Sequence, residues 1–390
     1  MTQQVETGLP FDNHRDTPMA LIDDFTKGLE ASGVVDYVWL WDELSGWFPR
    51  ELWKPENNPA AAFMDPNSTY DPFIHGAVAL AKNPRMNLRL STDAVRSAPA
   101  ELLRKMLSLA NCTEGKVVIC VGAGELRQTK PFGYKRAEGL KRLEDVMKLV
   151  RRLYDEPEPF TDDENNFWNF KNATIGTQRP KNRPEFWCLG GGPKLLDIAA
   201  RYADGFEAAT PQAIRTPEEF GKTVAMMRDK VESYGRDPEQ FGFGIWNMCV
   251  CHDDEDGIQE VLDNPLVKYF AGLFGRLDSS QWAEEGETPV MPEGWHYAMK
   301  WAPFEESQEE VRRIVNDVTP SMVRKSLHVG TPEQLRELNQ RFIDQGASFV
   351  GMIDMTPLAL GPAQAQESVR RNLEIFAGLK GNGARGVRGS

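Results

Sequence analysis

The sequence of 390 residues has little of what marks several large classes of protein. It contains no run of about 18 apolar residues, which a membrane-spanning helix needs, and its first residues lack the basic and apolar segments of a signal peptide. Lys and Arg number 45 against 58 Asp and Glu, which gives a formal net charge of −13. Because so acidic a chain is not expected to bind nucleic acid or a membrane surface, we expect a cytoplasmic protein with a small-molecule substrate.

Cysteine and histidine are also scarce, with five of each. The cysteines are odd in number and contain no C-x-x-C pair, so we expect free thiols in a reducing compartment rather than disulfides. The histidines show no spacing such as H-E-x-x-H, so no metal site is predicted. A G-x-S-x-G motif is absent too, which disfavours a covalent hydrolase.

What the sequence does contain is a repeated alternation of short apolar runs and amphipathic segments. Eight apolar runs are predicted to be strands: residues 4–9, 35–41, 86–91, 116–121, 186–189, 204–209, 241–251 and 348–353. Each is followed by at least one predicted helix, such as 18–32 with Thr17 as its N-cap, and 136–153. The pattern predicts an α/β fold, a single (β/α)8 TIM barrel over residues 1–379 with a disordered tail at 380–390. An open doubly wound sheet is the alternative.

Three polar or irregular stretches interrupt this alternation, at residues 44–71, 154–184 and 278–304. We interpret them as loop insertions on one face of the barrel. Strand-to-helix loops build the active site in such barrels, so chemistry is expected after the second, fourth, fifth and seventh strands. The aromatic residues of 278–304 are expected to form an apolar cover over the barrel mouth.

A glycine-rich turn follows the fifth predicted strand. Gly190, Gly191 and Gly192 precede Pro193 and Lys194, at the start of a predicted helix. Glycines let the backbone approach an anion and a helix N-terminus offers free N–H groups, so we predict a phosphate site. A tight turn without a ligand is the alternative. The segment is not a G-x-x-x-x-G-K-[ST] motif, so an ATP-type P-loop is not expected.

Polar or small residues also follow the second, third and fourth predicted strands. Asp42 and Glu43 are adjacent carboxylates whose repulsion would raise one pKa towards that of a general acid, and Trp47 offers an aromatic wall. Gly122–Glu125 leaves room for a flat ligand beside a carboxylate, and Ser91–Arg96 is polar where a strand meets its loop. For each segment, a solvated or capping turn that binds nothing is the alternative.

Together these segments resemble the bacterial luciferase-like superfamily, a set of eight-stranded barrels that use flavin or the deazaflavin coenzyme F420. The resemblance is strongest to the F420-dependent branch, which includes glucose-6-phosphate dehydrogenases, methylene-tetrahydromethanopterin reductases and phthiodiolone ketoreductases. It extends over about residues 4–378. The segments that carry it are residues 38–44, 47–53, 92–96, 121–125, 190–193 and 200–205.

The resemblance implies roles for individual residues. Asp42 would contact the edge of the deazaflavin, Trp47 would lie beside its reactive carbon, and Glu125 would handle the proton at N1. Leu90 and Ser91 would form a strand-end bulge behind the ring, often with a cis peptide bond. The cofactor contacts that it implies are Asp42, Leu90, Ser91, Thr92, Asp93, Gly122, Ala123, Gly124, Glu125, Gln128, Gly190, Gly191, Gly192, Lys194 and Leu195.

One position departs from the family pattern. Sugar-phosphate dehydrogenases have a His directly after the Asp, whereas this chain has Glu43, which disfavours a sugar substrate. Glu43 is instead predicted to supply the substrate proton, if burial raises its pKa. We predict hydride transfer between C5 of F420 and a carbonyl or activated double bond of a small or lipid-like substrate, contacted by His14, Trp47 and His75. An FMN-dependent two-component monooxygenase and a non-catalytic ligand-binding barrel are the alternatives, and a homodimer is expected by analogy.

Overall fold

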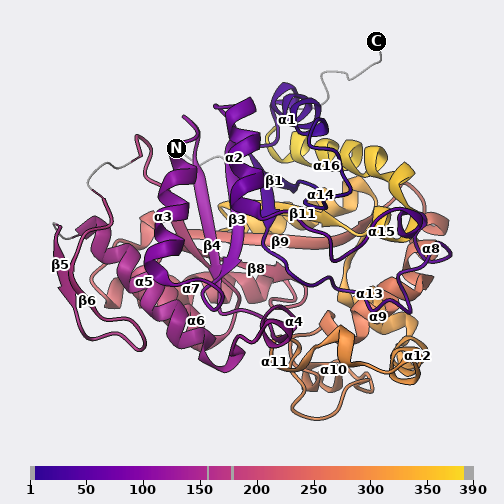
Figure 1. Cartoon of the computed structure of the whole chain (residues 1–390). Coiled ribbons are helices and arrows are strands. Elements are labelled where there is room, and N and C mark those ends of the chain that lie inside the picture. Colours follow the sequence, from indigo (N-terminus) through magenta and orange to yellow (C-terminus); the bar gives the residue numbers. More distant parts are fainter. Residues whose placement is uncertain (1–4, 156–157, 177–179, 382–390) are drawn as a thin grey trace.

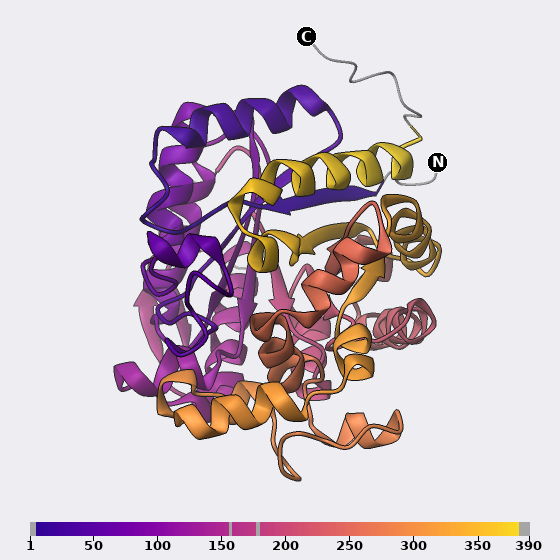
Figure 2. The same ribbon diagram turned by 90° about the vertical axis from the view of Figure 1, so that its right-hand side faces the viewer.

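The computed structural model describes residues 5–155, 158–176 and 180–381, and its centre is a barrel of eight parallel strands (Figures 1 and 2). The barrel strands are β1 (Glu6–Pro10), β2 (Tyr37–Trp41), β3 (Asn87–Asp93), β4 (Val117–Gly122), β7 (Glu185–Leu189), β8 (Gly205–Thr210), β9 (Gly242–Cys251) and β11 (Phe349–Asp354). Strand β9 pairs with both β8 and β11, which completes the ring. The predicted TIM barrel is therefore confirmed, and the open sheet, which would leave two unpaired edges, is wrong.

Apolar runs located the barrel strands well, because such strands are covered on both faces. Each end lies within two residues of its predicted position. Three short strands that have no such run were not predicted. They are β5 (Phe160–Asp162) and β6 (Phe170–Ala173), which form an antiparallel pair, and β10 (His328–Gly330), which pairs with the end of β9.

Helices cover the outside of the barrel, and most of them begin at a proline, whose fixed φ suits the first helical turn. They are α1 (Leu21–Ser32), α2 (Pro72–Lys82), α3 (Pro99–Ala110), α5 (Gly139–Asp155), α6 (Pro193–Tyr202), α7 (Pro217–Ser233), α14 (Pro332–Asp344) and α16 (Ala365–Leu379). The predicted cap of the first helix is wrong. The hydroxyl of Thr17 donates to the carboxylate of Asp12, and α1 begins only at Leu21.

A helical excursion between β9 and β10 has a hydrophobic core of its own. It consists of α8 (Glu255–Asp263), α9 (Pro265–Phe274), α10 (Ser280–Glu284), α11 (Tyr297–Lys300), α12 (Gln308–Asp317) and α13 (Pro320–Ser326), while the short helices α4 (Leu126–Thr129) and α15 (Thr356–Leu360) follow β4 and β11. Its core contains Phe270, Trp282 and Trp301, and includes Phe48 and Leu52 from the loop after β2. Figure 1 shows the excursion in orange tones beside α4.

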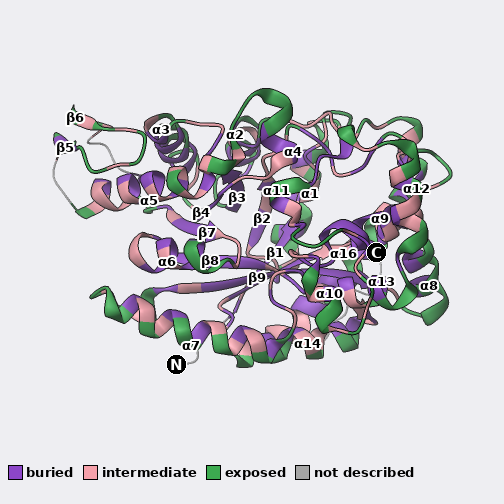
Figure 3. Cartoon of the chain, turned by 90° about the horizontal axis from the view of Figure 1, so that it is seen from below, coloured by how far each residue is buried: buried purple, intermediate pink, exposed green. Residues whose placement is uncertain are grey.

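The barrel interior is filled rather than hollow. The indole of Trp187 fits there because Gly205 and Gly242 on the next strands lack side chains: a Cβ would lie 2.7 Å and 2.1 Å from the ring atoms. Beside it, Arg89 and Glu207 form an ion pair of 2.8 Å with both side chains fully buried. Figure 3 shows the strands as a buried layer inside partly exposed helices. The open space for a ligand must therefore lie above this layer, at an end of the barrel.

Several further expectations concern the chain as a whole. All five cysteines are free, as predicted, and four of them are buried. No described helix is both long enough and apolar enough to cross a bilayer. Over the same described ranges, His, Cys, Asp and Glu side chains form no group of three that could hold a metal ion. Most of the predicted tail at 380–390 lies outside the described residues.

Candidate active site

Most of the predicted site residues lie on one side of the barrel mouth, at the carboxyl ends of the strands. The strand order β2–β3–β4–β7 places four of the predicted segments next to one another. Their registers also align these ends, because Trp41 pairs with Ser91 and Asp93 pairs with Gly122. Segments that lie about 30 to 150 residues apart in the chain therefore share one surface, as this fold requires.

Asp42 is fixed at the end of β2 by groups that come from β3 and its loop. The Thr92 hydroxyl donates to its carboxylate at 2.6 Å, and the Arg96 guanidinium lies 3.0 Å from the same group. Arg96 also pairs with Asp93. Burial raises the pKa of Asp42 above its ordinary value, although Arg96 and Thr92 act in the opposite direction.

Arg127 joins the two glutamates to which we assigned proton transfer. Its Nη2 lies 2.8 Å from Glu43 and its Nε lies 2.8 Å from Glu125. Its third donor binds the Ser45 carbonyl at 2.6 Å, and its guanidinium lies 4.3 Å from the Trp47 ring centre. Arg127 was not predicted as a site residue, because a polar segment after β4 indicates exposure, whereas α4 turns Arg127 inward until it is 2% exposed.

The predicted repulsion between Asp42 and Glu43 is wrong. Adjacent residues point to different partners here: Asp42 faces Arg96, whereas Glu43 faces Arg127 and accepts the indole N–H of Trp47. Each carboxylate is therefore compensated by its own arginine, and the two do not share a site. Burial raises the pKa of Asp42.

An aromatic wall from the helical excursion covers this cluster. The Trp47 ring packs against Phe270 at 5.8 Å, Phe274 at 5.1 Å and Trp301 at 5.2 Å between ring centres. Tyr297 packs on Phe274 at 4.6 Å, and burial together with the nearby charge of Glu125 raises its pKa. The apolar cover expected from residues 278–304 is thus present, and α9 supplies the part of it that the sequence analysis missed.

The predicted bulge behind the cofactor ring is wrong. Strand β3 pairs regularly with β4 as far as Asp93, and the cis peptide bonds of the described residues are at Glu158–Pro159 and Thr210–Pro211. The side chain of Leu90 is fully buried in the main core, so it does not line the mouth. Ser91 instead accepts the indole N–H of Trp39 at 2.7 Å, and the Trp39 ring packs on Trp246 at 4.3 Å.

The glycine turn after β7 leaves the start of α6 open. Gly190 has φ of 136°, which few other residues adopt, and its N–H donates to the Glu207 carbonyl. A Cβ on Gly192 would meet nothing within 4 Å, and α6 has no side-chain cap. Lys194 is exposed, whereas the side chain of Leu195 is buried in the core, so of these two only Lys194 can approach a ligand with its side chain.

Three other residues predicted to contact cofactor or substrate form hydrogen bonds within the protein. The Gln128 amide holds the loop after β2, because it accepts from the Leu44 and Ser45 N–H groups and donates to the Ser45 carbonyl. His75 is 2% exposed and bonds to Asn13 at 2.6 Å, and its contact with substrate stays a prediction.

His14 stays near the mouth, because it forms a bridge with Thr69, whose hydroxyl binds the Glu43 carbonyl. Its ring bonds to Asp12 at 2.8 Å. Burial lowers the pKa of His14, but the hydrogen bond and charge of Asp12 outweigh this and the pKa is raised overall. A raised pKa makes His14 a more persistent cation beside the loop after β2.

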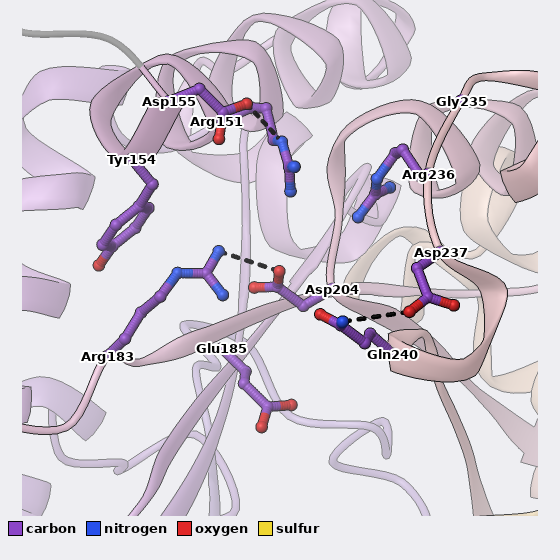
Figure 4. A pocket seen from close by; sticks show the side chains of 10 residues that line it. All are labelled: Arg151, Tyr154, Asp155, Arg183, Glu185, Asp204, Gly235, Arg236, Asp237 and Gln240. Carbon is purple, nitrogen blue, oxygen red and sulfur yellow. Dashed lines mark hydrogen bonds and ion pairs between the residues drawn. The ribbon is translucent and has the colours of Figure 1, made fainter.

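A cavity of about 660 Å³ lies at the opposite end of the barrel, where β7, β8 and β9 begin (Figure 4). Figure 4 shows Arg151, Arg183 and Arg236 directed towards its interior. Their charges are compensated locally: Arg151 pairs with Asp155 at 2.7 Å, Arg183 pairs with Asp204 at 2.9 Å, and Arg236 binds carbonyls at the end of α6. Because this end of a TIM barrel serves stability, we place the active site at the other end.

A smaller cavity of about 220 Å³ lies on the rim of the mouth, beside the loop after β2. It is lined by Leu44, Ser45, Arg50, Asp65, Asn67, Pro131, Phe132 and Phe304. Leu44, Phe132 and Phe304 are large apolar side chains with more than two fifths of their surface exposed. Exposed apolar side chains therefore lie on this rim beside polar ones.

Comparison with known proteins gives a match to one family model and to named relatives. The model described as luciferase-like monooxygenase matches residues 9–348. The chain is 24% identical over 351 residues to phthiodiolone/phenolphthiodiolone dimycocerosates ketoreductase of Mycobacterium kansasii, an alignment that covers 88% of this chain and 94% of that protein.

Solved structures share the fold. An F420-dependent secondary alcohol dehydrogenase in complex with an F420-acetone adduct superposes with a TM-score of 0.69 at 18% identity, covering 96% of this chain and 98% of that one. Riboflavin lyase RcaE, with modified FMN and riboflavin, superposes with a TM-score of 0.68 at 17% identity, covering 99% and 94%. At these identities the likeness shows the fold alone.

Proposed function

The chain belongs to the luciferase-like monooxygenase family, whose model matches most of its length, and on this premise we propose that it is an F420-dependent oxidoreductase. Its substrate would carry a carbonyl group or an activated double bond. The observation that carries the proposal is the cluster in which Arg127 joins Glu43 and Glu125 beside Trp47, at the mouth of the barrel. The named ketoreductase and F420-dependent dehydrogenase agree with this chemistry.

The residues present fit a deazaflavin with a phosphate-bearing tail. The open backbone at Gly192 and the uncapped start of α6 suit an anion, because free N–H groups and the helix dipole both favour negative charge there. Asp42 and Trp47 offer a polar and an aromatic contact for a planar ring. When bound, the coenzyme supplies a hydride at its C5 carbon.

The protein's own groups would move the protons. Glu43 uses Oε1 for both Trp47 and Arg127, and in the described part of the chain its Oε2 has no partner, so one oxygen can face the substrate. We assign the substrate proton to Glu43 and the N1 proton to Glu125, whose side chain is 24% exposed and can exchange with water. Arg127 keeps both carboxylates in position and compensates their charge.

The substrate is proposed to be apolar around its reacting carbon. Phe270, Phe274 and Trp301 form an apolar wall next to Trp47, and the exposed Phe132 and Phe304 extend this character to the rim. Burial of such surface strengthens binding by about 25 cal/mol per Å². A lipid-like ketone satisfies both the wall and the acids, which agrees with the ketoreductase among the relatives.

The first experiment identifies the cofactor. Purified protein is titrated with oxidised F420 and with FMN, and binding is followed by fluorescence. We expect F420 to bind at least tenfold more tightly. Tighter binding of FMN would support the alternative, an FMN-dependent monooxygenase, which the fold shared with an FMN-containing lyase keeps open. Binding of F420 without reduction of any ketone in a panel of apolar ketones would support a non-catalytic barrel.

The second experiment tests the proton role of Glu125. In Glu125→Gln, the single-turnover rate of hydride transfer is expected to fall about 100-fold, while the Kd for F420 changes less than threefold, since general acid–base groups contribute about 10²–10⁴ to rate. Glu138→Gln is the control, because Glu138 is also 24% exposed and also paired with an arginine, Arg142. Equal single-turnover rates in wild type and Glu125→Gln would remove Glu125 from the mechanism.

Two broader proposals accompany the activity. We propose that the protein is a homodimer and that it acts in the cytoplasm, both by analogy with luciferase-like barrels. Light scattering after gel filtration would give the mass in solution, for which the single chain weighs 43.9 kDa. A mass near 44 kDa at micromolar concentration would contradict the dimer.

A further inference from the structure

Three arginines converge on the cavity at the end of the barrel opposite the proposed active site (Figure 4). They come from separate elements: Arg151 lies near the end of α5, Arg183 precedes β7 and Arg236 precedes β9. Figure 4 shows the three guanidinium groups directed towards one another across the cavity. The closed sheet fixes this arrangement, because β7, β8 and β9 are neighbours and begin at the same end.

Protein partners use only part of the donors of these arginines. Arg151 donates through Nε to Asp155 at 2.7 Å, and Arg183 donates through Nη2 to Asp204 at 2.9 Å. Among the described residues Arg236 has no carboxylate partner, and it donates to backbone carbonyls at the end of α6. Because a guanidinium carries five N–H donors, donors of all three groups remain available to a ligand.

The carboxylates that line the same cavity have donors of their own. Asp204 also accepts a backbone N–H at 3.0 Å, and Glu185 accepts the indole N–H of Trp187 at 2.8 Å. Figure 4 shows the Glu185 carboxylate turned away from the three arginines, and the Asp237 carboxylate bonded to Gln240 at 3.1 Å. These acids are therefore committed to groups at the cavity wall.

The three positive charges repel one another across the cavity. Burial lowers the pKa of Arg236, and the charges of Arg151 and Arg183 lower it further. Asp204 and Asp155 act in the opposite direction, but the pKa stays lowered. Like charges held around a cavity are costly, and an anion between them offsets that cost. Since a water molecule takes about 30 Å³ in the liquid, the volume of about 660 Å³ has room for an anion of many atoms.

We propose that this cavity binds a phosphate group, either as inorganic phosphate or as the phosphate of a small ester. Guanidinium groups bind phosphate oxygens through parallel N–H donors, and three of them can surround a tetrahedral anion. The bound anion joins the end of α5 to the segments that precede β7 and β9, so it stabilises the closed barrel. The inference does not depend on the proposed function, because the cavity lies away from the mouth.

Calorimetric titration of the purified protein measures the binding. The probes are inorganic phosphate and glycerol 3-phosphate, and sodium chloride at equal ionic strength controls for screening. Tighter binding of one phosphate probe identifies the free ion or the ester as the better ligand. In Arg151→Gln the Kd is expected to rise about 10- to 100-fold, as loss of a hydrogen bond between charged groups does. Failure of both probes to bind wild type, or full affinity in Arg151→Gln, would overturn the proposal.

Arg313→Gln is the matched control for the loss of one charge. Like Arg151, Arg313 pairs with an aspartate four residues ahead, and the side chains of Arg313 and Arg151 are 37% and 33% exposed. Its removal is expected to change the Kd for phosphate by less than about twofold. Equal losses in the two variants would mean a general effect of net charge, which contradicts a specific contact.

A third variant, Gly192→Ala, tests whether the phosphate probes bind at the mouth instead. Gly192 is the N-cap of α6, after the carboxyl end of β7, whereas the cavity lies where β7 begins. The Kd for phosphate at the cavity is therefore expected to stay within about twofold in this variant. Lost binding in Gly192→Ala with full affinity in Arg151→Gln would place the phosphate at the mouth and reject the cavity.

Thermal unfolding separates phosphate binding from a structural role of Arg151. Its pair with Asp155 is partly exposed and contributes little, so without phosphate the Tm of Arg151→Gln should lie within about 2 °C of wild type. With phosphate at about 100 times the wild-type Kd, the Tm of wild type should rise by several degrees and that of the variant by much less. A variant with a lowered Tm that phosphate raises as much as in wild type would show a structural role and overturn the inference.

Discussion

Single residues with two partners determine the chemistry of this mouth. Arg127 contacts Glu43 and Glu125. Arg96 contacts Asp42 and Asp93. Each arginine therefore binds one acid that follows β2 and one acid that is close to it in sequence. An arginine suits this position because its planar fork offers several donors without losing its charge. The acids therefore keep fixed positions before any ligand arrives, which is what positioned proton transfer requires.

A residue-scale prediction concerns Glu306, at the rim of the helical excursion. Its carboxylate accepts the Tyr269 hydroxyl at 2.5 Å, and burial raises the pKa of Glu306 to about 7. Because the folded pKa exceeds the unfolded value of about 4.3, this group contributes stability below pH 4.3 that is lost as the pH rises through 7. We expect wild type to lose about 1–3 kcal/mol between pH 4.5 and 7.5 relative to Glu306→Gln.

Urea denaturation at a series of pH values measures this difference. Glutamine keeps an oxygen that accepts from Tyr269, so the variant removes the titration with little change in packing. Glu309→Gln, at an exposed position of α12, is the control and should follow wild type at every pH. Parallel stability curves for wild type and Glu306→Gln would disprove the raised pKa.

At the scale of one element, the glycine turn after β7 separates a conformational role from a binding role. Gly190 needs its positive φ, and a Cβ there would lie 3.2 Å from Leu195, so Gly190→Ala is expected to cost about 1–3 kcal/mol of stability. Gly192 has an ordinary φ of −71° and open space around it, so Gly192→Ala should change stability by less than about 0.5 kcal/mol.

The order of the two variants should reverse for F420 binding, where Gly192→Ala is expected to lose more affinity than Gly190→Ala. A methyl group at Gly192 occupies the space that a phosphate would use, so we expect F420 affinity to fall about tenfold in Gly192→Ala, measured by fluorescence titration. Gly28→Ala, in α1 and likewise without neighbours within 4 Å, controls for the added methyl group. Full affinity in Gly192→Ala would mean that α6 does not hold the tail.

The elements that the sequence predicts are those whose signal is local. Strands β1 to β4, β7 to β9 and β11 are apolar runs, and proline marks the starts of α2, α6 and α14. β10 has three residues and a histidine, and β5 and β6 lie in a polar stretch, so neither shows an alternating or apolar pattern. The start of α1 was misplaced because an acid earlier in the chain takes the hydroxyl of Thr17.

Site residues were predictable only where they follow an apolar run that itself predicts a strand. Asp42, Glu125 and the glycines after β7 follow apolar runs directly, so their position at the mouth follows from the barrel. Arg127 has no such signal, because its partners depend on how α4 packs. Ion pairing between distant segments is a tertiary property that a single sequence does not reveal.

At the scale of the whole molecule, a buried ion pair spans the barrel interior. Arg89 on β3 and Glu207 on β8 are three strands apart in the ring and meet at 2.8 Å. The guanidinium lies 3.8 Å from the Phe349 ring centre and 4.4 Å from that of Trp187. Other polar atoms of the pair, including Oε1 of Glu207, are buried without hydrogen bonds, so the desolvation cost is only partly offset.

This pair yields a prediction for the stability of the entire barrel. Arg89→Met leaves Glu207 charged and alone in the interior, so we expect a loss of about 3–5 kcal/mol, and Glu207→Leu should cost a similar amount by stranding Arg89. The double variant fills the space with apolar atoms among aromatic rings and should recover most of the loss.

Denaturation of all four proteins, followed by tryptophan fluorescence and circular dichroism together, measures the coupling. Because β3 and β8 belong to one closed sheet, both signals should shift together in each variant. If the double variant loses as much unfolding free energy as the two single variants added together, the two charges act independently. If the fluorescence and circular dichroism transitions separate, the barrel does not unfold as one unit.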